Sequence, residues 1–216
     1  MEFKVKHKRG ALAISDRAYY TKRSQKDGER DLSRLARTAN REDAWVFYED
    51  SGLWMHLPTK PYRRSTREGD LVVGVECPAV YKSDLGNVPI PYHIHPDFFV
   101  NNLVERLGAA APPEDKEAAR EVAYAWFSMP SNNDLSIVTG KGRGYEHRIT
   151  TARGTTALKA NHTEIPIQVC DAERLFRDCI DPRILNERGF ETGMKDAMNK
   201  ANNLFGQQLE VSFHLN

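Results

Sequence analysis

The sequence P-Y-H-I-H-P occupies residues 91–96, and P-S-N-N-D-L occupies residues 130–135. Side chains alternate between the two faces of a strand, so His93 and His95 lie on one face if this segment is extended. Two such imidazoles can bind one metal ion, and Asp134 can supply the third protein ligand of a catalytic zinc site. The alternative interpretations are a surface histidine pair at a strand end and a helix-capping box, in which the serine of the second segment caps a helix and Asp134 lies in its first turn.

Taken together, the two segments resemble the H-x-H-P…P-S-x-x-D-L motif of the JAB1/MPN/Mov34 (JAMM, or JAB) metallopeptidase family. The resemblance implies that His93, His95 and Asp134 hold zinc. It also implies that Ser131 helps to bind the oxyanion and that an upstream glutamate is the general base on the zinc-bound water. The family joins the two half-motifs by a short loop, whereas residues 96–130 separate them here.

We interpret this long separation as an insertion of two helices at residues 97–127. The first helix has an apolar stripe that Gly108 terminates. Pro112 and Pro113 then open the second helix, which carries acidic residues in its first turn. A chance match of the second half-motif is the alternative.

Three glutamates are candidates for the base. Glu42 lies at the junction between a predicted helix and a predicted strand, where the JAB family places its glutamate, and we rank it first. Glu49 lies at the far end of the same strand, and Glu76 lies on a later apolar strand. A solvated strand end is the alternative interpretation of each.

The remaining pattern predicts alternating strands and helices. Helical spacing and charge placement predict a helix at 27–40. Apolar runs predict strands, and helical patterns predict a C-terminal group of helices before a closing strand. The strands are expected at 3–8, 11–15, 44–48, 53–57, 71–77, 88–92, 145–159, 165–169 and 208–215, and the later helices at 172–176, 181–188 and 193–204.

Two further segments carry specific predictions. The prolines at 89 and 91 remove backbone donors, which predicts an edge strand or strand end that could hold an extended peptide by β-augmentation. Residues 58–69 are predicted to form a basic loop. His147, His162 and His214 lack a neighbouring ligand pattern and are interpreted as surface or hydrogen-bonded histidines.

The composition is that of a soluble globular protein. The 216 residues include 31 Lys and Arg against 30 Asp and Glu, so no whole-chain charge predicts binding to nucleic acid or to a membrane surface. No apolar run approaches the length that crosses a bilayer, and the first residues do not resemble a secretory signal. Three cysteines without C-x-x-C spacing predict reduced thiols, and we expect a cytoplasmic protein.

We therefore expect an α/β fold across residues 1–216, namely a JAB/MPN (cytidine deaminase-like) mixed curved sheet flanked by helices, with the insertion at 97–127. The resemblance implies a zinc metallopeptidase or isopeptidase acting on a protein or peptide substrate, with a ubiquitin-like or sulfur-carrier-like modifier as the suggested substrate class. A catalytically inactive MPN-like scaffold is the first alternative. Another metal-dependent hydrolase, such as a phosphoesterase, is the second, although it calls for more His and Asp ligands than the sequence offers.

Overall fold

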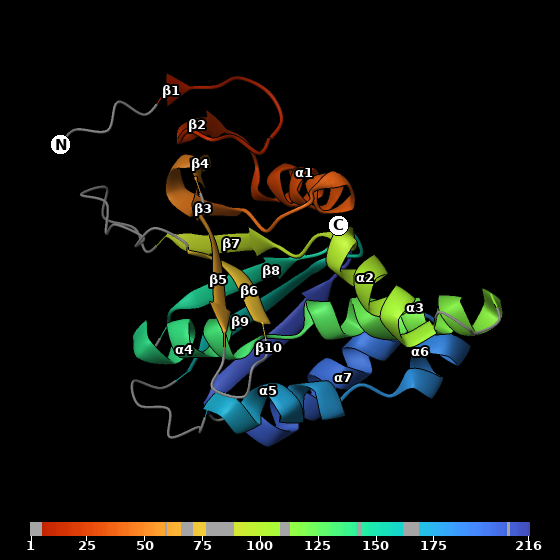
Figure 1. Cartoon of the computed structure of the whole chain (residues 1–216). Coiled ribbons are helices and arrows are strands. Elements are labelled where there is room, and N and C mark those ends of the chain that lie inside the picture. Colours follow the sequence, from red (N-terminus) through yellow and green to blue (C-terminus); the bar gives the residue numbers. More distant parts are fainter. Residues whose placement is uncertain are drawn as a thin grey trace.

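The computed structural model describes residues 6–58, 60–65, 71–76, 89–108, 113–141, 144–161, 169–206 and 208–216. These residues form an α/β fold around a mixed, open sheet with the strand order β1-β2-β4-β3-β7-β8-β9-β10 (Figure 1). Its strands are β1 (Lys6–His7), β2 (Tyr19–Lys22), β3 (Ala44–Tyr48), β4 (Leu53–Leu57), β7 (Ile90–Ile94), β8 (Glu146–Thr150), β9 (Thr155–Ala160) and β10 (Leu209–His214). A separate two-stranded sheet pairs β5 (Lys60–Ser65) with β6 (Leu71–Glu76).

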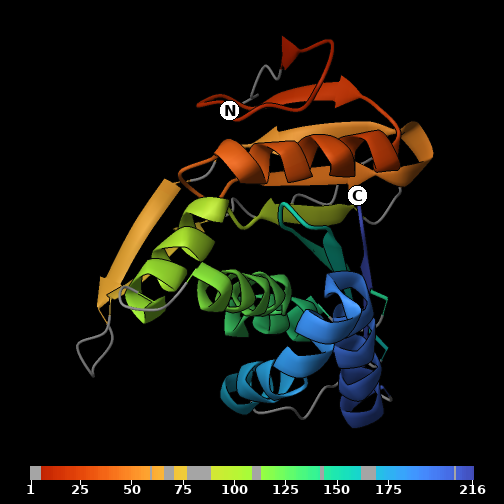
Figure 2. The ribbon, with the colours of Figure 1, turned by 90° about the vertical axis from the view of Figure 1, so that its right-hand side faces the viewer.

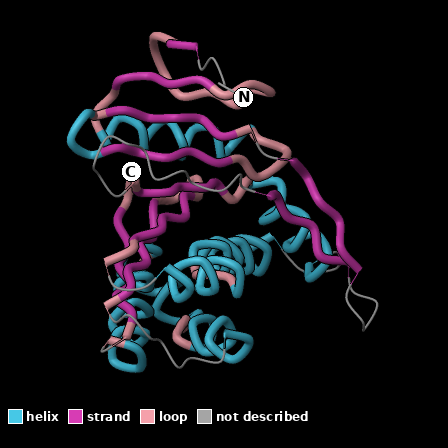
Figure 3. Tube along the Cα trace, turned by 90° about the vertical axis from the view of Figure 1, so that its left-hand side faces the viewer, coloured by secondary structure: helices cyan, strands magenta, loops and turns pink. Residues whose placement is uncertain are grey.

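The sheet is mixed because two of its neighbouring pairs, β1 with β2 and β7 with β8, run parallel. The other neighbouring pairs are antiparallel. Figure 3 shows that the sheet twists strongly, so that the strands at its two ends run in very different directions. Sheets twist in this way because of the handedness of L-residues.

Helices cover both faces of the sheet. They are α1 (Gln25–Thr38), α2 (Asp97–Gly108), α3 (Pro113–Ser128), α4 (Asn132–Lys141), α5 (Val169–Asp178), α6 (Pro182–Arg188) and α7 (Phe190–Phe205). Tyr92 of β7 contacts α1 through Glu29, whereas the next residue, His93, faces Asp134 of α4. Alternation along a strand therefore places α1 and α4 on opposite faces. Figure 2 shows α1 lying along one half of the sheet and α3 to α7 gathered on the other half. No helix among the described residues is both long and apolar enough to cross a membrane.

Most elements agree with the sequence patterns. Helix α1 begins and ends two residues earlier than the predicted 27–40, because Ser24 caps it by accepting a hydrogen bond from the N–H of Asp27. The strands predicted at 44–48 and 53–57 are confirmed as β3 and β4. Residues 97–108 and 113–128 are helical, as expected for most of 97–127.

Of the two alternatives predicted for residues 88–92, the edge strand is wrong, whereas the strand end agrees with the position of Pro91 as the second residue of β7. Strand β7 lies inside the sheet, between β3 and β8. The N–H of Ile94 donates to Asp43 on the β3 side and that of His95 donates to Thr150 on the β8 side. Backbone nitrogens point alternately to the two sides of a strand, so the nitrogen of Pro91 points toward β8. The registered pairs between β7 and β8 begin only at Tyr92, one residue later. The missing N–H of Pro91 therefore removes no hydrogen bond between registered residues of β7 and β8. Because β7 is paired on both sides, it offers no free edge for β-augmentation.

Four other predictions of secondary structure need correction. The segment 145–159, predicted as one strand, forms the antiparallel strands β8 and β9, which residues 151–154 connect. Residues 11–15 form no strand, because the N–H groups of Leu12 and Ala13 donate to the side chains of Asp31 and Tyr19. The basic segment 58–69 contains strand β5 at 60–65. The strand predicted at 165–169 lies outside the described residues except at Val169, which begins helix α5.

The contact between α1 and β4 yields a test of this packing. Gly28 of α1 lies against Trp54, and an added Cβ would come within 2.2 Å of the indole ring. Alanine is normally the better helix residue by roughly 1 kcal/mol. We nevertheless expect Gly28→Ala to lower the free energy of unfolding by about 1–3 kcal/mol, because overpacking outweighs propensity.

Denaturation by urea measures this change. Arg30→Ala, at an exposed position of the same helix, is the control and should change stability by less than about 0.5 kcal/mol. A Gly28→Ala protein as stable as the wild type would show that α1 does not pack on Trp54 as described.

Candidate metal centre

Three elements and the residue that follows one of them bring four buried polar side chains together beneath the sheet. The C-terminal end of β7 and the residue that follows it provide His93 and His95, β8 provides His147, and the first turn of α4 provides Asp134. Each of the four residues is at most 8% exposed. Because β7 and β8 run parallel, with His93 opposite Ile149, the two strands carry their histidines to the same region of one face.

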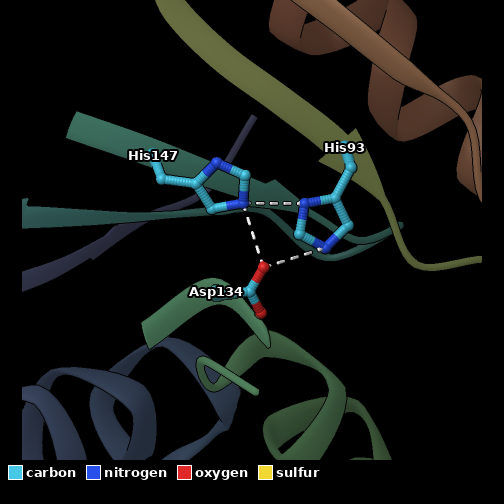
Figure 4. Close-up of side chains that lie close together, drawn as sticks. All are labelled: His93, Asp134 and His147. Carbon is cyan, nitrogen blue, oxygen red and sulfur yellow. Dashed lines mark hydrogen bonds and ion pairs between the residues drawn. The ribbon is translucent and has the colours of Figure 1, made fainter. Parts of the chain in front are cut away.

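His93, Asp134 and His147 form a buried group that could hold a metal ion (Figure 4). His147 Nε2 lies 3.0 Å from Asp134 Oδ1 and 3.0 Å from His93 Nδ1. His93 Nε2 lies 3.7 Å from the same Asp134 oxygen. One ligand atom from each of the three residues lies within 4.8 Å of the other two, so a single ion could contact all three residues.

His95 extends the group on the other side of His93. Its Nε2 lies 2.9 Å from His93 Nε2, and its Nδ1 lies 2.6 Å from the carbonyl oxygen of Phe127 at the end of α3. A carbonyl oxygen can only accept, so Nδ1 of His95 carries the hydrogen and Nε2 presents a lone pair to the centre. A second hydrogen bond of this kind is what orients a metal-binding histidine.

Glu42 is the predicted base candidate that lies beside the group. Its Oε1 is 3.7 Å from His95 Nε2, and its side chain is 18% exposed. Burial raises the pKa of Glu42, and the nearby charge of Asp134 acts in the same direction, against the attraction of His95. A raised pKa brings a carboxylate closer to the range that suits a general base at neutral pH.

The other two glutamates lie elsewhere in the fold. Pairing along β3 places Ala44 opposite His93 and Phe47 opposite Ile90, so Glu49 follows the strand end that is farther from the histidines. Its side chain is exposed. Glu76 ends β6 in the separate two-stranded sheet, and its side chain lies outside the described part of the structure.

Ser131 contacts Asp134 directly. Its hydroxyl and its backbone N–H donate to Asp134 Oδ2 over 2.7 Å and 2.8 Å. The pattern is the capping arrangement at the start of α4 that the sequence offered as its alternative interpretation. It also fixes the Asp134 carboxylate, so that Oδ1 is directed to the histidines. Helix capping and the predicted ligand role are therefore compatible.

His147 is the site residue that the sequence analysis missed. It was interpreted as a surface or hydrogen-bonded histidine, and it is hydrogen-bonded but 4% exposed. Its Nδ1 is buried without a hydrogen-bond partner among the described residues. Of the other two, His214 Nε2 donates to Glu29 on the opposite face of the sheet, and His162 lies outside the described residues.

The surroundings keep the centre in the protonation state that a metal requires. Burial lowers the pKa of His93 to about 3, despite the nearby Asp134. Burial opposes ionisation of Asp134, but His93 and the hydrogen bond from His147 outweigh it and hold the pKa of that carboxyl below its ordinary value. A neutral imidazole and an ionised carboxylate are the forms that bind divalent metals.

Comparisons with protein-family models, with curated proteins and with solved structures find no match for this chain.

The lowered pKa of His93 predicts that acid destabilises the metal-free protein. A group whose folded pKa lies below its unfolded value of 6.5 contributes stability above pH 6.5, and that contribution is lost as the pH falls toward 3. We expect the free energy of unfolding to drop by about 3 kcal/mol between pH 7 and pH 4 from this residue. Urea denaturation of the wild type and of His93→Gln measures it, and the variant should show the smaller drop. Equal drops in the two proteins would contradict the burial of a neutral His93.

Proposed function

We propose that this protein is a zinc-dependent hydrolase of peptide or isopeptide bonds, of the JAB/MPN type. The observation that carries the proposal is the meeting of Glu42, the two histidines of H-I-H-P and Asp134 in one buried group. These residues come from three distant segments, and the family motif requires each of those residue types there. The order of a helix, a glutamate, a buried strand and a later H-x-H strand also agrees with the family.

The ligand types suit zinc. His93 and Asp134 belong to the buried group that could hold an ion, and we propose His95 Nε2, which lies 2.9 Å from His93 Nε2, as the second imidazole of a catalytic set. His93 would then carry its hydrogen on Nδ1 and donate it to His147 Nε2, 3.0 Å away. His147 thus takes the place of the outer partner that orients a metal-binding histidine.

Each of these residues has its own role in the proposed reaction. When bound, zinc lowers the pKa of a water molecule toward neutrality and polarises the scissile carbonyl. Glu42 accepts a proton from the attacking water and delivers it to the leaving amine. Ser131 donates a hydrogen bond to the developing oxyanion once its hydroxyl turns from Asp134, which retains the Ser131 N–H. Burial of the group excludes bulk water and strengthens each of these interactions.

The substrate class is the C-terminal tail of a ubiquitin-like modifier joined to an amine, as the family resemblance suggests. The proposal places the protein in the cytoplasm with such substrates. Because β7 is paired on both sides, the tail is not held by that strand's edge.

A second candidate function is a binding scaffold with a closed metal centre. The observation that favours it is the distance of 3.0 Å between His147 Nε2 and Asp134 Oδ1, which lets His147 act as a fourth protein ligand. Four protein ligands are typical of structural zinc and leave no position for water. A protein that binds one zinc ion and hydrolyses no substrate would favour the scaffold.

Replacement of Glu42 tests the hydrolase. Glu42→Gln should retain one zinc ion per chain, because Glu42 is not among the ligands. Its turnover should fall at least about 10²-fold, the lower end of what a general base contributes. The assay follows cleavage of ubiquitin that carries a C-terminal peptide extension, beside zinc analysis of the same preparations.

Glu49→Gln is the matched control, since it removes a carboxylate from the other end of β3 at an exposed position. It should leave turnover within about twofold of the wild type, as surface substitutions usually do. Unchanged turnover in Glu42→Gln would exclude Glu42 as the base.

A further inference from the structure

A second buried pair, Asp43 and His56, lies one residue away from Glu42. Both residues are 0% exposed. His56 Nε2 lies 2.8 Å from Asp43 Oδ2, and His56 Nδ1 lies 3.2 Å from the carbonyl oxygen of Arg17. A carbonyl oxygen only accepts, so Nδ1 carries a hydrogen and the imidazole is held at both nitrogens. Its ring also stacks on Tyr19, with centroids 5.0 Å apart.

Asp43 connects three strands at the end nearest the metal centre. Its backbone carbonyl accepts from the N–H of Ile94, the residue between His93 and His95, over 3.1 Å. Its side chain accepts from the N–H of Ala44 through Oδ1 and contacts His56 of β4 through Oδ2. The position of β3 between β4 and β7 is therefore fixed at Asp43 by both backbone and side-chain contacts.

Glu42 depends on this connection for its position. The registered pairs of β3 with β4 and with β7 begin at Ala44, so residues 42 and 43 lie beyond them. The peptide between residues 42 and 43 sets the direction in which the Glu42 side chain leaves the backbone. A rotation at Asp43 would therefore move the Glu42 carboxylate relative to His95, from which it is now 3.7 Å away.

Stability alone is a poor explanation for such a pair. Burying polar or charged partners costs desolvation that their mutual attraction often fails to exceed, and apolar residues of similar volume do as well or better. The contacts of Asp43 do, however, connect the residue next to Glu42 with the segment of His93 and His95 and with the neighbouring strand β4. Groups that act on reacting atoms need supports of this kind, because displacement by about 1 Å can cost as much as 10²-fold in rate.

We propose that Asp43 and His56 are a positioning pair that holds the Glu42 carboxylate against the His95 side of the metal centre. The inference rests on the proposed function, because it concerns the base of that reaction. The pair acts by hydrogen-bond geometry. An asparagine at position 43 preserves this geometry, since its amide can donate to His56 Nε2 while its oxygen still accepts from Ala44. An alanine cannot do either.

The experiment compares Asp43→Ala with Asp43→Asn in the full chain. Three properties are measured on each protein: the cobalt(II) content and visible spectrum after loading with Co²⁺, the kcat and KM on peptide-extended ubiquitin with zinc, and the urea midpoint. We expect Asp43→Ala to bind one cobalt ion, to keep its KM and to lose at least about tenfold in kcat. Its cobalt spectrum should change in the way that Glu42→Gln changes it. Asp43→Asn should restore the wild-type spectrum and most of the rate.

Asn202→Ala is the control for stability. Asn202 of α7 exchanges two hydrogen bonds of 2.8 Å with the backbone of Val211, so its loss lowers stability within the other half of the protein. It should lower the urea midpoint without changing kcat or the cobalt spectrum. If Asp43→Ala behaves like Asn202→Ala, the pair is structural and the inference is overturned.

The remaining outcomes separate the two proposals. If the wild-type protein binds cobalt but cleaves nothing, hydrolysis of this substrate is excluded. The cobalt spectra of the variants then still decide whether Asp43 positions Glu42. Wild-type protein that binds no cobalt overturns both. Loss of cobalt binding in Asp43→Ala, with binding retained in the wild type, overturns the positioning role alone.

Discussion

Strand β7 pairs with β3 on one side and in parallel with β8 on the other, and the site depends on this central position. Pairing on both sides fixes the register of His93, and alternation along the strand directs its imidazole to the face that α4 covers. The same alternation sends Tyr92 to the opposite face, where its hydroxyl donates to Glu29 of α1. A shift of one residue in the register of β7 would exchange these faces, and it would separate His93 from Asp134 and Tyr92 from Glu29.

The candidate metal centre concentrates polar groups where an apolar core would otherwise lie. Buried polar groups normally require hydrogen-bond partners, and most atoms of this cluster have them through Phe127, Ser131 and each other. The exception among the described residues of the cluster is Nδ1 of His147. Three buried imidazoles around one carboxylate are difficult to explain by packing, because desolvation makes them costly. A divalent ion bound among them would explain their convergence.

Much of the local structure could be predicted from the sequence because it rests on local patterns. The aromatic and β-branched run at 44–48 predicts β3, and helical spacing with charge placement predicts α1. The ranking of Glu42 above Glu49 rested on the family resemblance, which implies a glutamate at a helix-to-strand junction, and that junction can be recognised from local sequence. The geometry agrees with that order, since Glu42 lies beside His95.

Strand neighbours could not be predicted in this way, because they are contacts between distant segments. Pro91 suggested an edge, yet a proline removes a donor on only one side of a strand, and that side has no registered partner there. His147 went unrecognised for a related reason. Nothing within residues 145–150 indicates that β8 lies parallel to β7, and only that pairing brings its imidazole to the histidines.

The central claim is that two imidazoles and the Asp134 carboxylate bind one zinc ion. Zinc K-edge X-ray absorption of protein loaded with one equivalent of Zn²⁺ tests it most directly. The account predicts a first shell of nitrogen and oxygen only, at about 2.0–2.1 Å, with outer-shell scattering from imidazole that weakens in His93→Gln and in His95→Gln. A first shell containing sulfur at about 2.3 Å, or an imidazole signal unchanged in both variants, would contradict it.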